Sequence, residues 1–486
     1  MLPTLVQHSA QLAEPAMATH ILIVLPKSNQ TPDKLDIFGK KTLESILRRR
    51  KMQPEEISKA PVLGTLESGA LCVWAMIDLA RPVFDQQTSM RKAVQLLTEE
   101  KPGEIHVAVY GNEEEKSSLV KVALYTAWIN AAQLPSRKTG IKSAEAKPLA
   151  HIVLHGYKDL QEVPLLKAKA EGNLLARDLT VLPPNELTPL NYRKRVQKLA
   201  TAEGWKYTEF DVKALRKMGA GAFVAVAQGS NTDDAAIVHL QRRIRNATKT
   251  VALVGKGICF DTGGYNVKPA RHMHGMNEDM NGSAVALGLL LAASRLDLPV
   301  NIDCWLAIAE NLISPHAYKQ DDVVTSLNGT TIEIVHTDAE GRMVLADTLT
   351  LAAREKPDAM IDFATLTGSM HTALGSRYSG IFSNRADLLE KALAAGKSSG
   401  ERTWSFPWDA DYDAELESRV ADVKQCTLEG EADHILATRF LSRFVDDAPW
   451  LHMDLSASNN KGGLGAVASD VTGFGVSWGI DLLTQL

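Results

Sequence analysis

Apolar residues along this chain fall into two alternating patterns. Short runs of aliphatic and β-branched residues, such as His20–Leu25 and Glu104–Gly111, are typical of β-strands. The longer run Ser117–Ala132 has the spacing of a helix. Strand-like and helix-like segments continue to alternate in the second half of the chain. This alternation predicts an α/β fold.

A proline-rich segment divides the chain. Leu182–Pro189 contains prolines that interrupt regular structure, and 486 residues exceed what one hydrophobic core normally serves. We therefore expect a smaller N-terminal α/β domain, residues 1–175, and a larger domain, residues 176–486. Further strands are expected at Ala222–Ala227, Ala236–Leu240, Thr250–Gly255, Ile302–Ile308 and Trp450–Leu455.

A short acidic stretch lies between a strand-like and a helix-like run. Thr330–Val335 is β-branched and predicts a strand, and Met343–Ala353 has helical spacing. Between them stand Asp338 and Glu340, followed by Arg342. In α/β proteins, ligands bind where the carboxyl end of a strand leads into a helix. A solvated turn is nevertheless the commoner fate of such a pair, so this stretch alone does not identify a site.

Two further segments place carboxylates in similar positions. The apolar run Thr250–Gly255 leads into the glycine-rich segment Lys256–Lys268, which contains Asp261 and can form a tight loop. An exposed hairpin with surface lysines is the alternative, but surface lysines are uncommon in so apolar a segment. Asp279 precedes the helical run Ala284–Arg295, where it could also serve only as a helix cap.

Charge and hydropathy exclude several classes of partner. The formal net charge of −5 provides no general attraction for nucleic acid or anionic membranes, and the basic run Arg242–Arg245 is more typical of a solvated turn than of a binding patch. The longest apolar stretch, Ala284–Ala293, is too short to cross a bilayer. Met1–His8 lacks the basic and apolar regions of a signal peptide. We expect a cytoplasmic protein without a membrane or nucleic-acid partner.

The cysteines and histidines do not form a recognisable metal motif. The four cysteines are scattered and contain no CxxC pair, which argues against a zinc ribbon or a dithiol centre and fits a reducing compartment. His272 and His274 form an HxH pair without a third histidine nearby, so they are poor zinc candidates.

The four carboxylates instead predict a metal centre if their segments meet. Asp261, Asp279, Asp338 and Glu340 would repel one another unless cations lay among them. Oxygen ligands suit divalent metals, and two metals need carboxylates that bridge them. Two divalent ions would balance the four negative charges. The ligand set suits manganese or zinc, with magnesium as a third choice.

Three motifs with their spacing closely resemble those of the leucyl (cytosol) aminopeptidase family. They are Val254–Gly264, Asp279–Met280 and Thr337–Arg342, and the resemblance extends from about Leu175 to the end of the chain. It implies a larger C-terminal α/β/α catalytic domain with a mixed central sheet. It also implies a homohexamer. The N-terminal region resembles the family only weakly, and for it we consider a macro-domain-like fold and a role in oligomer contacts.

The resemblance also implies a role for each candidate ligand. Asp261 and Glu340 would bridge two divalent ions, Asp338 would complete the more exchangeable site, and Lys256 with Asp279 would complete the tighter one. A lysine binds metal only as the free amine, so the ion must displace its proton.

Two further residues match the family's catalytic residues that do not bind metal. Lys268 would stabilise the negative charge that develops on the carbonyl oxygen. Arg342 would hold a bicarbonate that serves as general base, near a helix N-terminus that favours anions. Peptides with a free N-terminus would be the substrates, because Asp279 and a metal would bind the α-amine, and a water bridging the metals would attack the scissile carbonyl.

Residues that shape the first side-chain site are only partly those of the family. Met276, Thr365 and Gly368 match family positions, whereas Ser456 and Asn459 stand where apolar residues are common. A more polar wall weakens discrimination among apolar side chains, so we expect broad specificity. His336 stands where the family usually has asparagine, and the sequence gives no account of it.

Two alternatives to an aminopeptidase remain. Another two-metal amidase or a dipeptidase would use the same ligands. A non-catalytic relative that acts as a binding or regulatory protein would belong to a different class, and the loss of a ligand would favour it. The sequence retains every ligand of the family's motif.

Overall fold

The computed structural model describes residues 2–13, 18–27, 36–139, 148–158, 160–230 and 234–486, which form two compact units. Unit 1 consists of Met1–Leu174, Lys397–Gly400 and Lys461–Thr472. Unit 2 consists of Leu175–Gly396, Glu401–Asn460 and Gly473–Leu486. The boundary after Leu174 lies within helix α5 (Val163–Thr180), and two short segments from the C-terminal half belong to unit 1.

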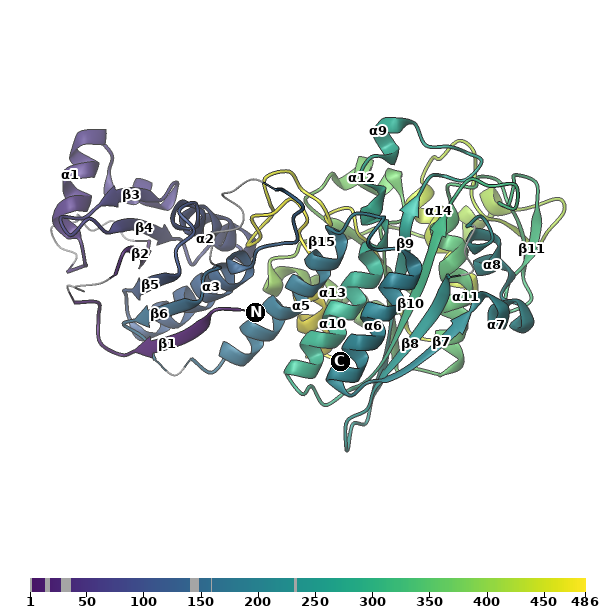
Figure 1. Cartoon of the computed structure of the whole chain (residues 1–486), viewed down its shortest axis with the longest axis horizontal. Helices are drawn as coiled ribbons and strands as arrows, with labels where there is room; N and C mark the ends of the chain where they lie inside the picture. The colour runs from purple at the N-terminus through teal and green to yellow at the C-terminus, as the bar shows by residue number, and fades with distance from the viewer. Residues whose placement is uncertain (1, 14–17, 28–35, 140–147, 159, 231–233) are drawn as a thin grey trace. The chain divides into compact units, whose positions relative to one another are not determined.

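Unit 1 is built on a six-stranded sheet with the order β1-β6-β5-β2-β4-β3. Its strands are β1 (Thr4–His8), β2 (His20–Pro26), β3 (Val62–Thr65), β4 (Leu71–Ile77), β5 (Glu104–Val109) and β6 (His151–His155). Neighbouring strands are parallel except β3 and β4. Helices α2 (Val83–Thr98) and α3 (Glu113–Ala131) cover one face, and α1 (Lys40–Arg50) and a 3-10 turn (Pro54–Ser58) cover part of the other (Figure 1).

Unit 2 contains an eight-stranded mixed sheet with the order β15-β14-β17-β13-β9-β10-β8-β7. Its strands are β7 (Lys206–Asp211), β8 (Ala236–Arg242), β9 (Thr250–Asp261), β10 (Asn301–Asn311), β13 (Ala359–Ala364), β14 (Ser379–Ser383), β15 (Thr403–Ser405) and β17 (Trp450–Asp454). The four central strands, β17, β13, β9 and β10, run parallel. Unit 2 also contains a small three-stranded sheet with the order β11-β12-β16. Its strands are β11 (Val323–Thr325), β12 (Thr331–Glu333) and β16 (Val423–Lys424).

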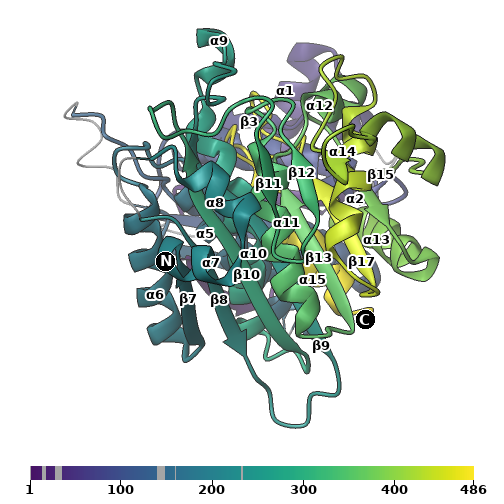
Figure 2. The ribbon, with the colours of Figure 1, turned by 90° about the vertical axis from the view of Figure 1, so that its right-hand side faces the viewer.

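Helices cover both faces of the large sheet (Figure 2). On one face lie α6 (Pro189–Glu203), α10 (Asn281–Arg295) and α15 (Val476–Leu483), and on the other lie α8 (Gly221–Ala227), α11 (Glu340–Arg354) and α14 (Asp433–Leu441). The remaining helices of unit 2 are α7 (Val212–Met218), α9 (Ala270–Met273), α12 (Gly368–Leu374), α13 (Ala386–Ser399) and the 3-10 segments Met276–Met280, Ala410–Leu416 and Ser442–Phe444. The predicted α/β class with a mixed central sheet is confirmed.

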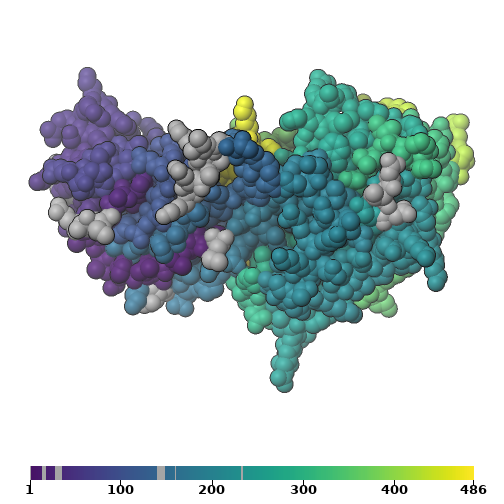
Figure 3. All heavy atoms as spheres, viewed as in Figure 1, coloured from purple at the N-terminus to yellow at the C-terminus, as the bar shows by residue number. Residues whose placement is uncertain are grey.

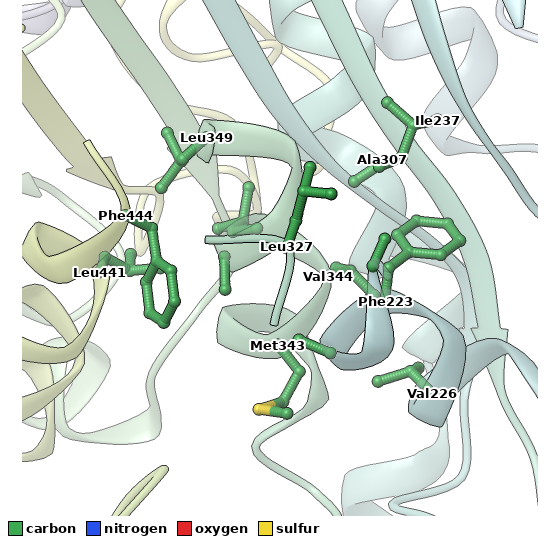
Figure 4. Packing of buried hydrophobic residues seen from close by; sticks show 14 of the residues in the cluster. Phe223, Val226, Ile237, Ala307, Leu327, Met343, Val344, Leu349, Leu441 and Phe444 are labelled. Carbon is green, nitrogen blue, oxygen red and sulfur yellow. The ribbon is translucent and has the colours of Figure 1, made fainter. Parts of the chain in front are cut away.

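The core between α8, α11, α14 and the sheet fixes the helix that carries Glu340 and Arg342. Figure 4 shows Met343, Val344 and Leu349 of α11 packed among side chains of other elements, including Phe223 of α8 and Phe444. All five of these side chains are essentially excluded from solvent. Helix α11 is therefore positioned by burial along its length, as expected for a helix with apolar residues on most sides.

One predicted strand is wrong. Ala222–Ala227 forms helix α8 and not a strand. Every residue of this run is buried, so its apolar character carries no periodicity, and a short continuous apolar run fits either element equally well.

The predicted loop that contains Lys256 and Asp261 is also different in the structure. Strand β9 continues through both residues to Asp261, because β10 pairs with it in parallel as far as Asn311. Gly255 allows a close approach, since a Cβ on it would lie 2.4 Å from the Cα of Ser283 in α10. The tight turn comes only after the strand, where Gly263 and Gly264 have φ values of 87° and 65°.

Two arginines of the basic run Arg242–Arg245 contact the nearby segment Leu298–Asp303. Arg242 is buried, and its Nη1 donates to the carbonyls of Leu298 and Val300. Arg243 pairs with Asp303, with Nη2 2.9 Å from Oδ1. The connection that follows, residues 243–249, projects beyond the rest of unit 2 (Figure 3). Across the described ranges, no helix is both long enough and apolar enough to cross a membrane.

Asp347 ties α11 to two neighbouring segments and generates a test of the fold. Its carboxylate accepts hydrogen bonds from the backbone N–H of Phe223 at 2.8 Å and of Leu327 at 2.7 Å, and it is fully buried. Burial raises the pKa of Asp347 to about 6, although both donors act to lower it. Because the site is buried, water could not take the place of this carboxylate as the acceptor for the two N–H groups.

We expect Asp347→Ala to lower the free energy of unfolding by about 2–5 kcal/mol, because it leaves two buried N–H groups without an acceptor. Urea unfolding followed by circular dichroism measures the change. Glu390→Ala, on the exposed surface of α13, is the control and should stay within about 0.5 kcal/mol of the parent. An unchanged unfolding midpoint for Asp347→Ala would contradict this account of the core.

Candidate metal centre

The candidate residues lie where the central parallel strands of unit 2 end. Lys256 is in β9 and Asp261 is its last residue, Asn311 is the last residue of β10, Thr365 directly follows β13, and Asp454 ends β17. Because these strands are parallel, their carboxyl ends share one edge of the sheet, which is the usual place for a ligand in such folds.

A pocket of about 970 Å³ opens at this edge. The ten site residues expected from the sequence all line it: Lys256, Asp261, Lys268, Met276, Asp279, Asp338, Glu340, Arg342, Thr365 and Gly368. His336, Ser456 and Asn459 line it as well. Residues that are more than 200 positions apart in the sequence, such as Lys256 and Asn459, thus share one concave surface.

Carboxylates form the floor of this pocket. Oxygens of Asp261, Asp338 and Glu340 lie within 4.8 Å of one another. Nζ of Lys256 joins Asp279 to this group, since it lies 2.8 Å from Asp279 and 2.9 Å from Glu340. The Thr365 hydroxyl donates to the same Asp279 carboxylate at 2.6 Å.

Two lysines balance only part of this negative charge. Nζ of Lys268 lies 2.9 Å from Asp261 and 2.5 Å from Asp338. Together with Lys256 it supplies two positive charges against four carboxylates. The pocket therefore has a formal excess of two negative charges in a largely buried place, where unpaired charge is costly.

The titration of the buried groups reflects this excess. Burial raises the pKa values of Asp279, Asp338 and Glu340, and repulsion from neighbouring carboxylates raises them further. Burial alone would lower the pKa of Lys256, but Asp279 and Glu340 raise it well above its ordinary value. Lys256 can therefore act as a neutral ligand only where a cation displaces its proton.

The residues present fit a pair of divalent ions. Oε2 of Glu340 is buried and has no hydrogen-bond partner among the described residues, so a buried oxygen faces the pocket with its lone pairs unused. An all-oxygen carboxylate set with one amine suits manganese, zinc or magnesium. Further cations would also remove the charge excess.

The acidic loop is held from behind by Gln425. Its Oε1 accepts the backbone N–H groups of Val335 and His336, and its Nε2 donates to the carbonyl of Ala339. Gln425 is fully buried. One amide side chain thus fixes the loop that presents Asp338.

His336 completes the turn of this loop. Its Nδ1 lies 3.2 Å from the backbone N of Asp338 and accepts that N–H. An asparagine oxygen can accept the same bond from the residue two positions on, so histidine can serve here in place of asparagine. Burial lowers the pKa of His336, and the Lys268 ammonium lowers it further, which keeps Nδ1 available as an acceptor.

The glycine between Glu340 and Arg342 allows Lys256 to approach the backbone closely. A Cβ on Gly341 would lie 2.6 Å from Cε of Lys256, a distance that real Cβ atoms do not adopt. Glycine at this position therefore lets the lysine reach Asp279 and Glu340.

Arg342 is paired with a residue that the sequence did not single out. Its Nη1 donates to the carbonyl of Gln425 at 3.0 Å, and its Nη2 lies 2.8 Å from each oxygen of Asp433. Burial alone would lower the pKa of Arg342, but Asp433 raises it. The guanidinium thus binds a side-chain anion.

Sequence reasoning also missed two supporting residues. Nδ2 of Asn311 donates to Asp261 at 2.8 Å, and Asp454 accepts from Leu366 N and the Thr367 hydroxyl. Both end a strand, and this position at the carboxyl edge of the sheet was the signal that could have found them. Gln425 and Asp433 carried no such signal, because neither ends a strand of the large sheet.

The wall expected to receive the first side chain is polar. Nδ2 of Asn459 lies 2.9 and 3.2 Å from the two carboxylate oxygens of Glu278, which also lines the pocket. The Ser456 hydroxyl donates to the carbonyl of Tyr378 at 2.6 Å. Met276 contributes apolar surface to the same pocket.

Comparisons with known proteins match the part of the chain that carries these residues. The profile described as "Cytosol aminopeptidase family, catalytic domain" matches residues 174–478. A probable cytosol aminopeptidase of Nitrobacter winogradskyi is 42% identical over 317 residues, which are 65% of this chain and 62% of that protein. One of Syntrophotalea carbinolica is 44% identical over 316 residues, 65% of this chain and 63% of that protein. The chain thus spans just under two thirds of the length of these curated relatives.

A solved structure extends the likeness to nearly the whole chain. The bottromycin maturation enzyme BotP in complex with Mn has a TM-score of 0.83 and 28% sequence identity, and the match covers 96% of this chain and 99% of that one. With its family profile matched over more than half of its length, this chain belongs to the cytosol aminopeptidase family.

Proposed function

We propose that this protein is a dinuclear metal-dependent aminopeptidase that releases N-terminal amino acids from peptides. One observation carries the proposal: an amine and four carboxylates converge at the carboxyl edge of the central strands and keep an excess of negative charge. The pocket around them is large enough for the end of a peptide. Family membership supports the same activity.

Five residues would hold the metals. Asp261 and Glu340 would serve both ions, Lys256 and Asp279 would complete one site, and Asp338 would complete the other. When bound, two divalent ions acidify a water between them and polarise the scissile carbonyl. Manganese is supported by the Mn complex of the BotP neighbour, and zinc and magnesium suit the same oxygen donors.

The chain's own cations and carboxylates orient the substrate. Asp279 receives the free α-amine of the peptide, which restricts the protein to N-terminal residues. The Lys268 ammonium, at the edge of the carboxylate group, stabilises the charge that develops on the carbonyl oxygen. Arg342 holds the anionic base; the family resemblance supplies a bicarbonate here, whereas Asp433 lies on the guanidinium in this structure.

The protein's location and assembly follow the same reasoning. All four cysteines are buried free thiols, which supports a reducing, cytoplasmic compartment. Exposed apolar side chains on unit 2, among them Tyr265, Val267 and Ile313, offer surface for contacts in a homohexamer.

Metal binding is the first test. We expect Glu340→Gln to weaken Mn²⁺ binding by at least about 100-fold, because loss of a bridging ligand should exceed the loss of an outer partner. Isothermal titration of Mn²⁺ into metal-free protein measures the affinity, and hydrolysis of aminoacyl 4-nitroanilides measures activity.

Glu355→Gln is the matched control, since Glu355 is exposed at the other end of α11. It should leave metal affinity and activity unchanged. Hydrolysis that persists after complete metal removal, or full activity of Glu340→Gln, would rule out the proposed chemistry.

Substrate preference is the second test. Because Ser456, Asn459 and Glu278 make the wall polar, the ratio of kcat/KM between leucine and polar N-terminal residues should stay within about 10-fold, the range of one or two methylene contacts. A panel of aminoacyl 4-nitroanilides measures it. A strong preference for leucine over serine, glutamine and lysine would overturn broad specificity.

Assembly is the third test. Sedimentation velocity of the metal-loaded protein should give a species six times the mass of one chain, 52.9 kDa. Ile313→Glu, which puts a charge on an exposed apolar side chain that does not line the pocket, should shift that species toward smaller ones. A monomer at all concentrations would refute the hexamer without affecting the metal chemistry.

A further inference from the structure

Asp433 lines the pocket but is not one of the five proposed metal ligands. It is the first residue of α14, and 21% of its side chain is exposed. Arg342, whose Nη2 lies 2.8 Å from both carboxylate oxygens, is only 2% exposed. A buried cation therefore keeps this carboxylate at a fixed place on the wall of the pocket, and that cation, Arg342, stands two residues after Glu340 in the sequence.

The backbone is arranged to bring Asp433 to this place. Ala432, directly before it, has φ 51°, a left-handed conformation that residues with a Cβ rarely adopt. Asp433 also stands in the first turn of its helix, where a carboxylate is favoured. The unfavourable conformation at Ala432 persists because the surrounding contacts determine it.

The guanidinium of Arg342 already binds one anion in this structure. Nη1 donates to the Gln425 carbonyl and Nη2 to Asp433, and the remaining Nε is buried. A dissolved anion that bound the same side of the guanidinium would compete with Asp433 for Nη2. It would also stand against the Asp433 carboxylate and be repelled by it. The anion that Arg342 binds here is therefore supplied by the chain itself.

Other carboxylates outside the cage have structural partners. Asp454 accepts from Leu366 N at 3.0 Å and from the Thr367 hydroxyl at 2.6 Å. Glu278 accepts both bonds from Asn459. Asp433, in contrast, binds a permanent cation with one lone pair of each oxygen and reaches solvent in the pocket, so lone pairs remain to accept a proton.

We propose that Asp433 is a built-in base of this site: its carboxylate takes the place of an exchangeable bicarbonate on Arg342, so that hydrolysis needs no dissolved anion. This step rests on the proposed aminopeptidase function. The attacking water gives one proton to an Asp433 oxygen while its own oxygen forms the bond to the scissile carbon. When the C–N bond breaks, the electron pair goes to nitrogen, and the proton passes from Asp433 to that leaving amine.

Anion binding gives a readout that does not depend on catalysis. Sodium formate and sodium bicarbonate are titrated by calorimetry into the metal-loaded full chain of the parent, Asp433→Ala and Asp433→Asn. Asp433→Ala opens the guanidinium and should bind one additional anion. The parent and Asp433→Asn should not, because a carboxylate or a carboxamide of the same shape fills the place.

Hydrolysis in buffer depleted of carbon dioxide gives the second readout. The parent should work at the same rate with or without added bicarbonate. Asp433→Ala and Asp433→Asn should both lose roughly 100-fold in kcat, the ordinary effect of removing a general base. Formate or bicarbonate should restore part of the rate of Asp433→Ala only.

Asp413→Asn is the matched control. Asp413 pairs with Arg439 of the same helix α14, with Nε at 2.8 Å from Oδ1 and Nη2 at 2.5 Å from Oδ2, but does not line the pocket. This variant should keep the parent's rate and bind no additional anion. Equal melting temperatures of the two Asp433 variants and the parent establish that the comparison concerns folded protein.

Three outcomes would overturn the proposal: a parent rate that falls when bicarbonate is removed, a parent that binds the same additional anion as Asp433→Ala, or an Asp433→Ala rate equal to the parent's in depleted buffer. If even the parent hydrolyses no aminoacyl amide, the proposed function fails, while the calorimetric comparison still decides whether Asp433 fills the anion place.

Discussion

The mutual repulsion of four carboxylates in one partly buried pocket is the constraint on which the rest of unit 2 depends. Lys256 and Lys268 contact all four groups, yet two positive charges leave the set negative. Such an arrangement is stable only if the surrounding structure forces the groups together and cations complete it. Parallel strands do the first, because their carboxyl ends bring Asp261 and its neighbours to one edge.

The second requirement is that the acidic loop cannot relax away from this repulsion. Gln425 holds the backbone at Val335, His336 and Ala339, and the Tyr318 hydroxyl donates to the carbonyl of Thr337 at 2.6 Å. Helix α11, which begins at Glu340, is anchored in the core along its whole length. The loop that carries Asp338 is therefore held in place by hydrogen bonds between its backbone and two neutral side chains, those of Gln425 and Tyr318.

Arg342 links this rigid loop to the segment that carries Asp433. It shares the Gln425 carbonyl on one side and the Asp433 carboxylate on the other. A permanently charged, buried guanidinium gives the pocket wall an anion that is separate from the cage. In consequence, the anion on Arg342 is a different group from the four carboxylates that Lys256 and Lys268 contact.

The sequence by itself determined the α/β class and the central strands, and it singled out the residues that line the pocket, because these depend on local periodicity and on short motifs. The same local reasoning made a strand of Ala222–Ala227, since a run that is buried on every side has no period to distinguish helix from strand. It also left His336 unexplained, although its bond to the N–H of Asp338 spans only two residues, because a histidine has no fixed turn preference.

Only the tertiary structure decided what surrounds the ligands. Gln425 and Asp433 lie 83 and 91 positions from Arg342 in the sequence, and nothing in their local context marks them. A single hydrogen bond between distant residues leaves no periodic trace in either segment. It arises when the sheet closes and the core fixes α11 and α14, and that long-range packing gave Arg342 its anion.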